Sequence, residues 1–152
     1  MIVVGIDPGL KGGYAILSDG GALSASPLPI IGGEVAVREL MDEISMLGPP
    51  DMIVIERVHS MPAQGVASTF TFGKNYGRLT GMVEGAGWPL LLVNPPDWKK
   101  LVLRGTAKDK AAACAYVRQR YPNVQLIQPR CRVEHDGIAD AVCIAEWGLK
   151  SL

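Results

Sequence analysis

The sequence has few of the features that mark secreted or membrane proteins. It contains only three cysteines, Cys114, Cys131 and Cys143, an odd number with no close pair along the chain. A disulfide framework and a zinc site are therefore both disfavoured. No apolar run approaches the roughly 20 residues that a membrane-spanning helix needs. No basic segment precedes the apolar residues near the N-terminus, as it would in a signal peptide. We therefore expect a cytoplasmic protein with reduced thiols and no contact with a membrane.

Internal repeats, low-complexity tracts and linkers are also absent. The 152 residues suit one domain rather than two. Apolar residues make up 48% of the chain, enough for a hydrophobic core, and charged residues make up 20%, too few for a disordered chain. We therefore treat residues 1–152 as a single domain.

The charge is zero overall but unevenly distributed. The 15 basic and 15 acidic residues balance, which taken alone argues against binding of a polyanion. Residues 1–56 hold two basic and eight acidic residues, a net charge of −6. Residues 57–132 hold twelve basic and three acidic residues, a net charge of +9, and residues 133–152 carry −3. This pattern predicts a polyanion-binding surface beside clustered carboxylates, with ordinary solvated faces as the alternative.

Hydrophobic patterning predicts an α/β fold. Strands are expected over residues 2–6, 14–17, 22–30, 52–55 and 89–93, with a small extra strand over 124–127. Helices are expected over residues 34–47, 66–85, 97–103, 106–121 and 136–149, the fourth capped by Thr106. Two prolines place the third strand at an edge, whereas 89–93 has the pattern of a central strand. The order predicts a mixed five-stranded β-sheet flanked by α-helices.

Two of the predicted strands end in a carboxylate, Asp7 and Glu56. Ligands of open α/β sheets bind beyond the carboxyl ends of the strands, so we expect these two side chains to lie together if the strands are neighbours. Asp136 and Asp140 are four residues apart on the last predicted helix, which places them on one helical face. That helix is otherwise apolar and should pack on the sheet, with both aspartates facing Asp7 and Glu56.

Four clustered carboxylates indicate a cation site, because they cannot all ionise at low cost without a partner. Hard divalent cations prefer oxygen ligands, so Mg²⁺ is predicted, with Mn²⁺ as a substitute. Two such ions about 4 Å apart can activate water and stabilise the leaving oxygen of a phosphodiester. Each carboxylate also has a simpler explanation as part of a turn, a strand end, a helix cap or a helix surface, so the prediction depends on their combination.

Three motifs in order resemble the RuvC family of Holliday-junction resolvases, which has the RNase H-like fold. They are G-I-D-P-G-L at residues 5–10, I-V-I-E at 53–56 and H-D-G-I-A-D-A at 135–141. The resemblance spans nearly the whole chain and is strongest to the phage and related bacterial members. It implies a homodimeric, metal-dependent endonuclease of DNA recombination and repair, acting in a bacterial or phage-infected cytoplasm. Such an enzyme cuts branched DNA at four-way junctions by paired, symmetric incisions.

The resemblance also implies roles for the carboxylates. Asp7 would bridge two metal ions, Glu56 would ligate one of them, and Asp140 matches the final ligand of the family. The family commonly places another acidic residue or a histidine three positions before that ligand, where this chain has Gly137. Asp136 is the nearest substitute on the same helical face. His135 is left open as a supporting group or water activator.

Two segments are candidates for DNA binding by the same resemblance. The region over 58–78 would insert into the junction, with Phe70 or Phe72 as an apolar wedge or, alternatively, as helix core. Around Leu79–Val83 the family forms its dimer interface, and the small residues Gly77, Gly81 and Gly85 would permit close helix approach. The basic side chains that we assign to phosphate contacts are Lys74, Arg78, Lys99, Lys100, Arg104, Lys108 and Lys110, the last two near a helix N-terminus. Trp98 is assigned to the core.

Three other functions are alternatives to a junction-cleaving nuclease. A phosphotransferase of the actin and sugar-kinase class needs two domains and a second glycine-rich phosphate loop, which the sequence lacks, so no nucleotide cofactor is predicted. An RNase H-like nuclease acting on RNA, such as an rRNA-processing enzyme, would share the carboxylates. A catalytically inactive module that binds DNA junctions is the third alternative, and the retained carboxylates argue against it.

Overall fold

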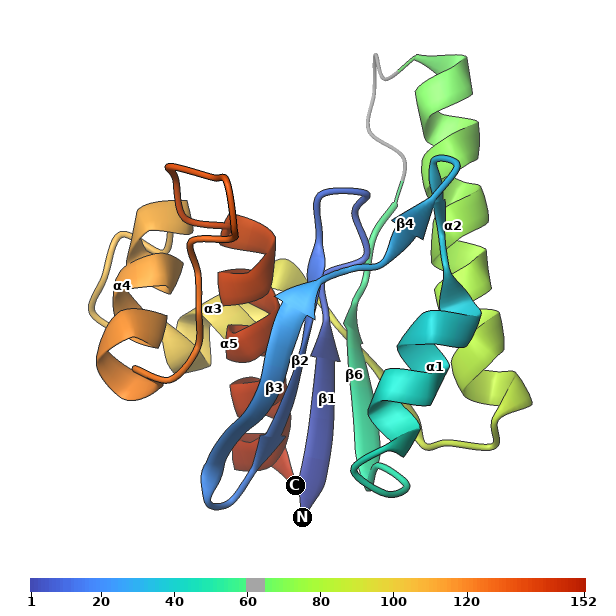
Figure 1. The fold of residues 1–152 in the computed structure, drawn as a ribbon. Coiled ribbons are helices and arrows are strands. Elements are labelled where there is room, and N and C mark those ends of the chain that lie inside the picture. The colour runs from blue at the N-terminus through green and yellow to red at the C-terminus, as the bar shows by residue number, and fades with distance from the viewer. Residues whose placement is uncertain (60–64) are drawn as a thin grey trace.

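Five strands form one mixed sheet in the order β3-β2-β1-β6-β7 (Figure 1). The computed structural model describes residues 1–59 and 65–152. The strands are β1 (Ile2–Ile6), β2 (Gly13–Ser18), β3 (Gly21–Pro27), β6 (Met52–Glu56) and β7 (Leu90–Val93). β1 pairs antiparallel with β2 and parallel with β6, and β6 pairs parallel with β7. The predicted α/β class with a mixed five-stranded sheet is confirmed.

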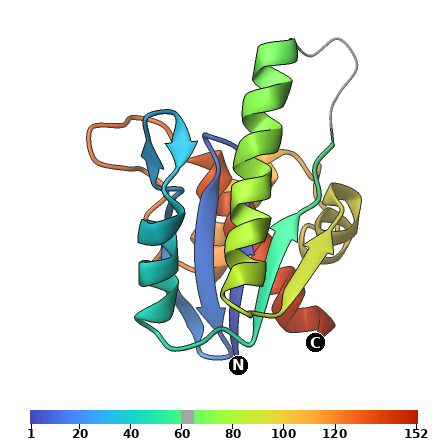
Figure 2. The same ribbon diagram turned by 90° about the vertical axis from the view of Figure 1, so that its right-hand side faces the viewer.

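Helices cover both faces of the sheet. They are α1 (Val37–Ser45), α2 (Val66–Gly85), α3 (Pro95–Val102), α4 (Lys110–Arg120) and α5 (Asp136–Ser151). α1 and α2 lie on one face, α5 lies on the other, and α3 and α4 pack outside α5 (Figures 1 and 2). Across the part of the chain that the structure describes, no helix is both long enough and apolar enough to cross a membrane.

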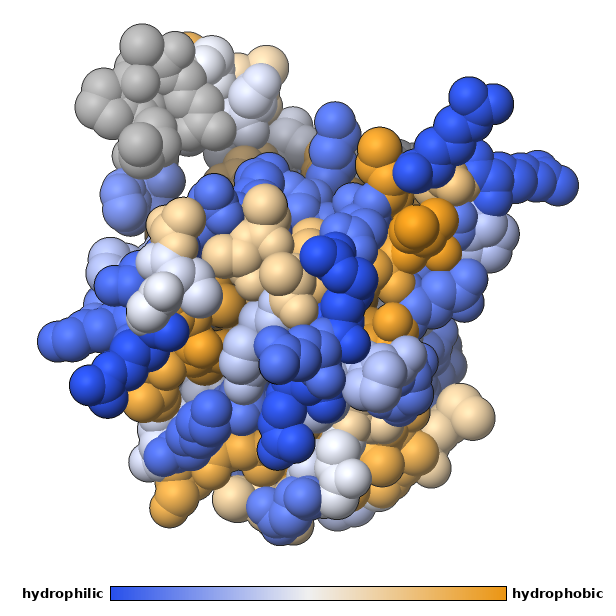
Figure 3. Space-filling view, turned by 90° about the vertical axis from the view of Figure 1, so that its left-hand side faces the viewer, coloured by the Kyte–Doolittle hydropathy of each residue, from blue (hydrophilic) through white to orange (hydrophobic). Residues whose placement is uncertain are grey.

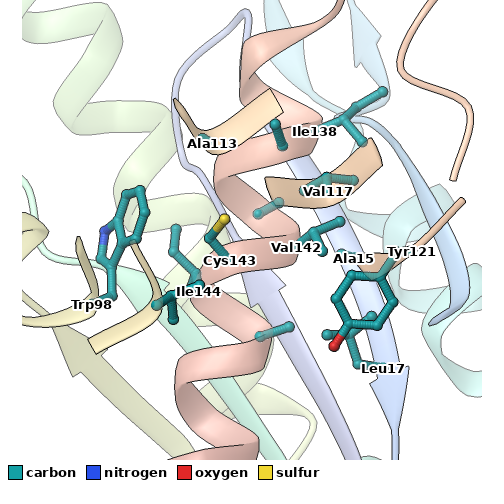
Figure 4. Close-up of a cluster of buried hydrophobic side chains, with 14 of the residues drawn as sticks. Ala15, Leu17, Trp98, Ala113, Val117, Tyr121, Ile138, Val142, Cys143 and Ile144 are labelled. Atoms are coloured by element: carbon teal, nitrogen blue, oxygen red, sulfur yellow. The ribbon is translucent and has the colours of Figure 1, made fainter. Parts of the chain in front are cut away.

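α5 is the central helix of the molecule and is buried on nearly all sides. Its apolar side chains meet the sheet on one side and α3 and α4 on the other (Figure 4). A side chain at Gly5 of β1 would collide with the backbone of Ala141, so the glycine lets α5 approach the strand closely. Gly148 lies against Val3, further back along β1. α5 therefore runs antiparallel to β1, and its first turns lie at the carboxyl end of that strand.

The predicted helix over 34–47 begins three residues late because a small ribbon precedes it. Ile30–Ile31 (β4) and Glu34–Val35 (β5) pair antiparallel. The ribbon is fixed by buried Asn75 of α2, whose Oδ1 accepts the Val35 N–H at 2.8 Å. A tertiary hydrogen bond thus takes these residues out of the helix.

Three further predictions about elements were wrong. β7 is an edge strand rather than a central one. The segment 124–127 forms no strand and contributes one isolated bridge between Ile127 and Glu134. Thr106 does not cap the next helix, because the Asp109 side chain accepts the Ala112 N–H at 2.8 Å and α4 starts at Lys110. Part of the predicted loop over 57–65, residues 60–64, lies outside the described residues.

Candidate active site

The four predicted carboxylates come from three elements that meet at one end of the sheet. Ile6 of β1 pairs with Ile55 of β6. Asp7 follows the first of these residues and Glu56 the second, so the two carboxylates lie at adjacent strand ends. Asp136 and Asp140 occupy the first two turns of α5 at the same end. The negative charges of Asp140, Glu56 and Asp136 all act on Asp7, so the four carboxylates lie near one another.

Asp7 is the carboxylate most strongly disfavoured in its ionised form. Burial is the largest cause, followed by the charges of Asp140 and Glu56, and together they raise the pKa of Asp7 to about 7. The Gly9 N–H donates weakly to Oδ1 at 3.5 Å and opposes this shift. The fold therefore disfavours a negative charge at this position.

Asp140 shares this environment. Burial raises the pKa of Asp140 to about 6, with contributions from the charges of Glu56 and Asp136. Lys99 of α3 opposes the shift, so its ammonium group lies close enough to act on the site. A cation bound beside Asp7 and Asp140 would therefore stabilise the ionised forms of both side chains.

Asp136 differs from the other carboxylates because it has a cationic partner. Lys110, the first residue of α4, forms an ion pair with Oδ2 of Asp136. This hydrogen-bonded pair holds the pKa of Asp136 below its ordinary value. Lys110, predicted as a phosphate contact, lies instead at the rim of the carboxylate cluster.

Glu56 is oriented by a buried tryptophan. The Trp98 indole N–H donates to Oε2 of Glu56 at 2.6 Å, and the Trp98 side chain is fully buried under α5. The core assignment of Trp98 is confirmed, but its polar contact with a candidate ligand was missed. A tryptophan 42 residues away in sequence gives no pattern by which such a contact could be anticipated.

His135 and Gly137 take structural positions. His135 is the N-cap of α5, and its Nδ1 accepts the Ile138 N–H at 3.2 Å. A side chain at Gly137 would collide with the backbone of Lys11 and Gly12 in the loop between β1 and β2. The chain therefore has no room for an acidic residue three positions before Asp140, and this explains the departure from the RuvC pattern.

The donor set suits a hard divalent cation. All four candidate ligands are carboxylates, two of them with raised pKa values, and oxygen is the ligand atom that Mg²⁺ and Mn²⁺ prefer. Within residues 1–59 and 65–152, no three acidic, histidine or cysteine side chains converge closely enough to enclose an ion. Asp136 is directed toward Lys110 and Glu56 toward Trp98, so these carboxylates do not converge on one point.

A cavity of about 480 Å³ opens beside the carboxylates. It is lined by Asp7, Gly9, Lys11, Gly12, Lys110, Asp136 and Asp140. A second, more apolar groove of about 550 Å³ shares Gly9 and Lys11 with it and extends to Thr71 and Phe72 on α2. A continuous path thus leads from the carboxylates to the N-terminal half of α2.

Solved structures with this architecture cover nearly the whole chain. Thermus thermophilus RuvC aligns over 99% of this chain and 96% of its own at 20% identity, with a TM-score of 0.68. The same protein in complex with Holliday junction substrate gives 19% identity and 0.69 over the same shares. The Fowlpox virus resolvase complexed with Holliday junction DNA gives 15% and 0.62, over 99% of this chain and all of that one. The fold is that of the RuvC-type resolvases. No family model and no curated protein matches the sequence.

The two phenylalanines of α2 have different surroundings. Phe70 is 71% exposed on the first turns of the helix, so it is not core. Phe72 is half-buried and lines the groove beside Leu10 and Lys11. Of the two predicted wedge candidates, Phe70 is therefore the one that projects into solvent.

Lys74 and Arg78 are engaged within the protein. Lys74 forms an ion pair with Glu34 of β5, and Arg78 donates to the Val35 carbonyl oxygen at 3.0 Å from one terminal nitrogen. Arg78 also lies 3.5 Å from Glu34. Both side chains fasten the β4–β5 ribbon to α2, which the sequence prediction of phosphate contacts did not anticipate.

The remaining predicted phosphate contacts lie on α3 and the turn after it. Lys99 stacks over the Trp98 ring, with Nζ 5.2 Å from its centroid. Lys100, Arg104 and Lys108 are exposed. The positive charge of Lys99 acts on Asp140. The other three side chains add positive charge to the surface.

The predicted dimer segment has two unlike faces. Leu79 and Val83 are fully buried against the sheet, so they cannot form an interface. The opposite, exposed face carries glycine at every fourth position, Gly73, Gly77, Gly81 and Gly85, and a side chain at any of these would meet nothing within 4 Å. A cleft of about 400 Å³ between α1 and α2, lined in part by Met41, Gly81 and Gly85, adjoins this stripe.

Proposed function

We propose that the protein is a metal-dependent endonuclease that resolves four-way DNA junctions by paired, symmetric nicks. The observation that carries this proposal is the cluster that Asp7 and Glu56, at the carboxyl ends of two parallel strands, form with Asp136 and Asp140 of α5. Within it the pKa values of Asp7 and Asp140 are raised. Because one fold supports many reactions, the site rather than the fold makes the argument. The RuvC-type architecture then favours branched DNA as the substrate.

Asp7, Glu56 and Asp140 would hold the metal, with Asp136 as a fourth oxygen ligand once released from Lys110. When bound, Mg²⁺ or Mn²⁺ supplies an activated water and stabilises the leaving oxygen of the phosphodiester. The protein's own residues position these ligands: Trp98 orients Glu56, the Gly9 N–H contacts Asp7, and the first turns of α5 present both aspartates. Burial keeps bulk water from screening the charges.

The surfaces beside the site suit a branched, negatively charged ligand. The groove from Lys11 to Phe72 connects the carboxylates with the projecting N-terminal half of α2. Exposed Phe70 on that helix can insert between base pairs at the branch point, since apolar wedges unstack DNA at such steps. Lys99, Lys100, Arg104 and Lys108 would contact phosphates, which position the substrate without reading its sequence.

Paired incisions require two active sites, so we propose a homodimer that operates in the cytoplasm. The glycine stripe on the exposed face of α2 is the candidate interface, because small residues let a second helix approach closely. A two-fold axis through this stripe places the same surface on both subunits, as closed dimers require.

A panel of substrates tests the proposal. Purified protein is incubated with a synthetic four-way DNA junction, its linear duplex control and an RNA hairpin, with Mg²⁺, with Mn²⁺ and with a chelator. We expect symmetric nicks in the junction only, with either metal, and none with the chelator. Cleavage of the RNA alone would transfer the assignment to an RNA-processing nuclease. Junction binding without cleavage in any metal would leave a binding module.

A further inference from the structure

The loop that leads into α5, the helix that carries Asp136 and Asp140, presents two arginines. Residues 127–134, here called the Arg130 loop, begin and end at the Ile127–Glu134 bridge and include Arg130, Cys131, Arg132 and Val133, all exposed. The loop leads directly into the N-cap His135 and then Asp136, so it lies at the same end of the molecule as the first turns of α5 (Figure 1). Figure 3 views the molecule from the side on which α4 and this loop lie, and long hydrophilic side chains project at the upper right of that face.

The loop holds Arg130 in an unfavourable backbone conformation. Its φ is +64°, in the left-handed region where glycine is favoured and other residues are uncommon. Among the described residues, only one other non-glycine residue has a positive φ, and that is Lys108 at +57°. Both strained residues are cations, and they stand on the two loops that enter α4 and α5. Strain of this kind concentrates at functional sites, where the side chain matters more than the backbone cost.

The surrounding structure fixes the position of the loop. The Cys131 N–H donates to the Gln128 carbonyl oxygen at 3.0 Å and closes a turn. The His135 N–H donates to the Leu126 carbonyl oxygen at 2.8 Å across the base of the loop. Arg118 of α4 forms an ion pair with Glu134, so the loop is fastened to the same helix that begins at Lys110. The arginines are thus held at a defined place relative to Asp136.

The charges of the loop are not neutralised within the described part of the protein. Six ion pairs are formed there, and none of them includes Arg130 or Arg132. Glu134, the acidic residue nearest in sequence, is already engaged by Arg118. Two guanidinium groups outside these ion pairs, on the loop that leads into the aspartate-bearing helix, suit a ligand with several phosphates, because the guanidinium fork matches phosphate oxygens.

We infer that Arg130 and Arg132 bind backbone phosphates of a junction arm flanking the strand to be cut. This inference rests on the proposed function and adds a DNA contact from the loop before α5, on the side of the site opposite to α2. The arginines carry no sequence information, so they would strengthen binding to all junctions equally. Lys108, the other strained cation, extends the same positive edge toward α3.

The test is the salt dependence of junction binding, measured without cleavage in the presence of a chelator. A labelled four-way junction is titrated with wild type, with R130Q/R132Q and with the control R120Q, which removes an exposed arginine from the far end of α4. Two lost phosphate contacts should lower the slope of log Kd against log salt by about 1.8 and weaken binding on the order of tenfold at low salt. The control should match wild type.

A second variant separates the contact from loop structure. Arg130→Gly relieves the positive φ and should raise the thermal midpoint while still weakening junction binding. Unchanged slope and affinity in both loop variants, or an equal loss in the control, would overturn the inference while leaving the nuclease assignment intact. If wild type fails to prefer the junction over linear duplex, the proposed function itself fails, and the loop contact fails with it.

Discussion

At the scale of single residues, the site contains two carboxyl groups, Asp7 and Asp140, whose ionised forms the fold disfavours. Asp7 combines burial with three like-charged neighbours, and its pKa is raised to about 7. The ordinary value is 3.8, so the folded, metal-free protein retains a proton that the unfolded chain has lost throughout the interval between them. A divalent cation reverses this effect, because it binds the deprotonated form.

We therefore expect the free energy of unfolding of the metal-free protein to fall as pH rises from about 4 to about 7. Asp140, with its pKa raised to about 6, contributes in the same direction. Asp7→Asn should remove much of this slope and make the metal-free protein more stable than wild type at pH 7. Urea unfolding of wild type and variant at several pH values, with a chelator present, measures this pH dependence. Adding Mg²⁺ at pH 7 should stabilise wild type and not the variant. A flat wild-type profile would contradict the electrostatic account.

Trp98 acts at the same scale as a positioning residue for Glu56. Trp98→Phe keeps most of the buried ring and removes the N–H that donates to Oε2. Hydrogen bonds to charged groups contribute about 1.5–3 kcal/mol, so Mg²⁺ should bind roughly tenfold more weakly or worse. Calorimetric titration of Mg²⁺ checks this, and Trp88→Phe is the matched control. Equal Mg²⁺ affinity in the wild type and Trp98→Phe would show that the indole serves packing alone.

At the scale of elements, the approach of α5 to the sheet and to the β1–β2 loop determines where the aspartates stand. Gly137 lies against Gly12 with no room for a methyl group. The same close approach recurs at Gly5, deeper in the sheet. These glycines hold the first turns of α5 at the carboxyl end of β1.

Gly137→Ala should destabilise the protein by about 1–3 kcal/mol, because the added methyl group overpacks a backbone contact. It should also reduce Mg²⁺ binding, since Asp136 and Asp140 would move with the helix. Gly20→Ala is the matched control: the added methyl group lies in an exposed turn with only ordinary contacts, so stability should change by less than about 0.5 kcal/mol. Thermal unfolding of both variants and of wild type measures the effect. Equal thermal midpoints for Gly137→Ala and wild type would refute the packing argument.

Sequence periodicity predicted α2 to the residue and α5 to within two residues of its end, because both helices have long, continuous patterns. It also predicted the carboxylate cluster, since strand ends and helical spacing fix those positions. It failed where tertiary contacts decide. Asn75 holds Val35 in a ribbon, and Trp98 reaches Glu56 from a distant segment. The sequence also did not reveal that Lys74 forms an ion pair with Glu34, or that Arg78 donates to the Val35 carbonyl oxygen.

At the scale of the whole molecule, the acidic site, the groove and the exposed turns of α2 lie at the end opposite to both termini (Figure 1). Net charge is zero, yet charge is unevenly placed: Lys99 and Lys110 act on the carboxylates, and further exposed cations stand on α3, the turn after it and the Arg130 loop. Under the proposed function, the cations would contact the DNA backbone and the anions would hold the metal.

The glycine stripe of α2 gives a prediction about assembly. Gly77→Leu/Gly81→Leu should convert a dimer into a folded monomer, because leucine blocks close helix approach while favouring the helix itself. Light scattering after gel filtration measures the mass, and circular dichroism confirms folding. Wild type that is monomeric at micromolar concentration, or a variant that remains dimeric, would exclude this face as the interface.

The central claim is that the carboxylates cut a DNA branch through a bound metal, and one comparison tests it most directly. Wild type and Asp7→Asn are mixed with the same labelled four-way junction in Mg²⁺, and binding and strand cleavage are both recorded. We predict paired nicks at symmetric positions by wild type, and a variant that binds the junction at least as well but leaves every strand intact. Cleavage by Asp7→Asn at the wild-type rate would contradict the account.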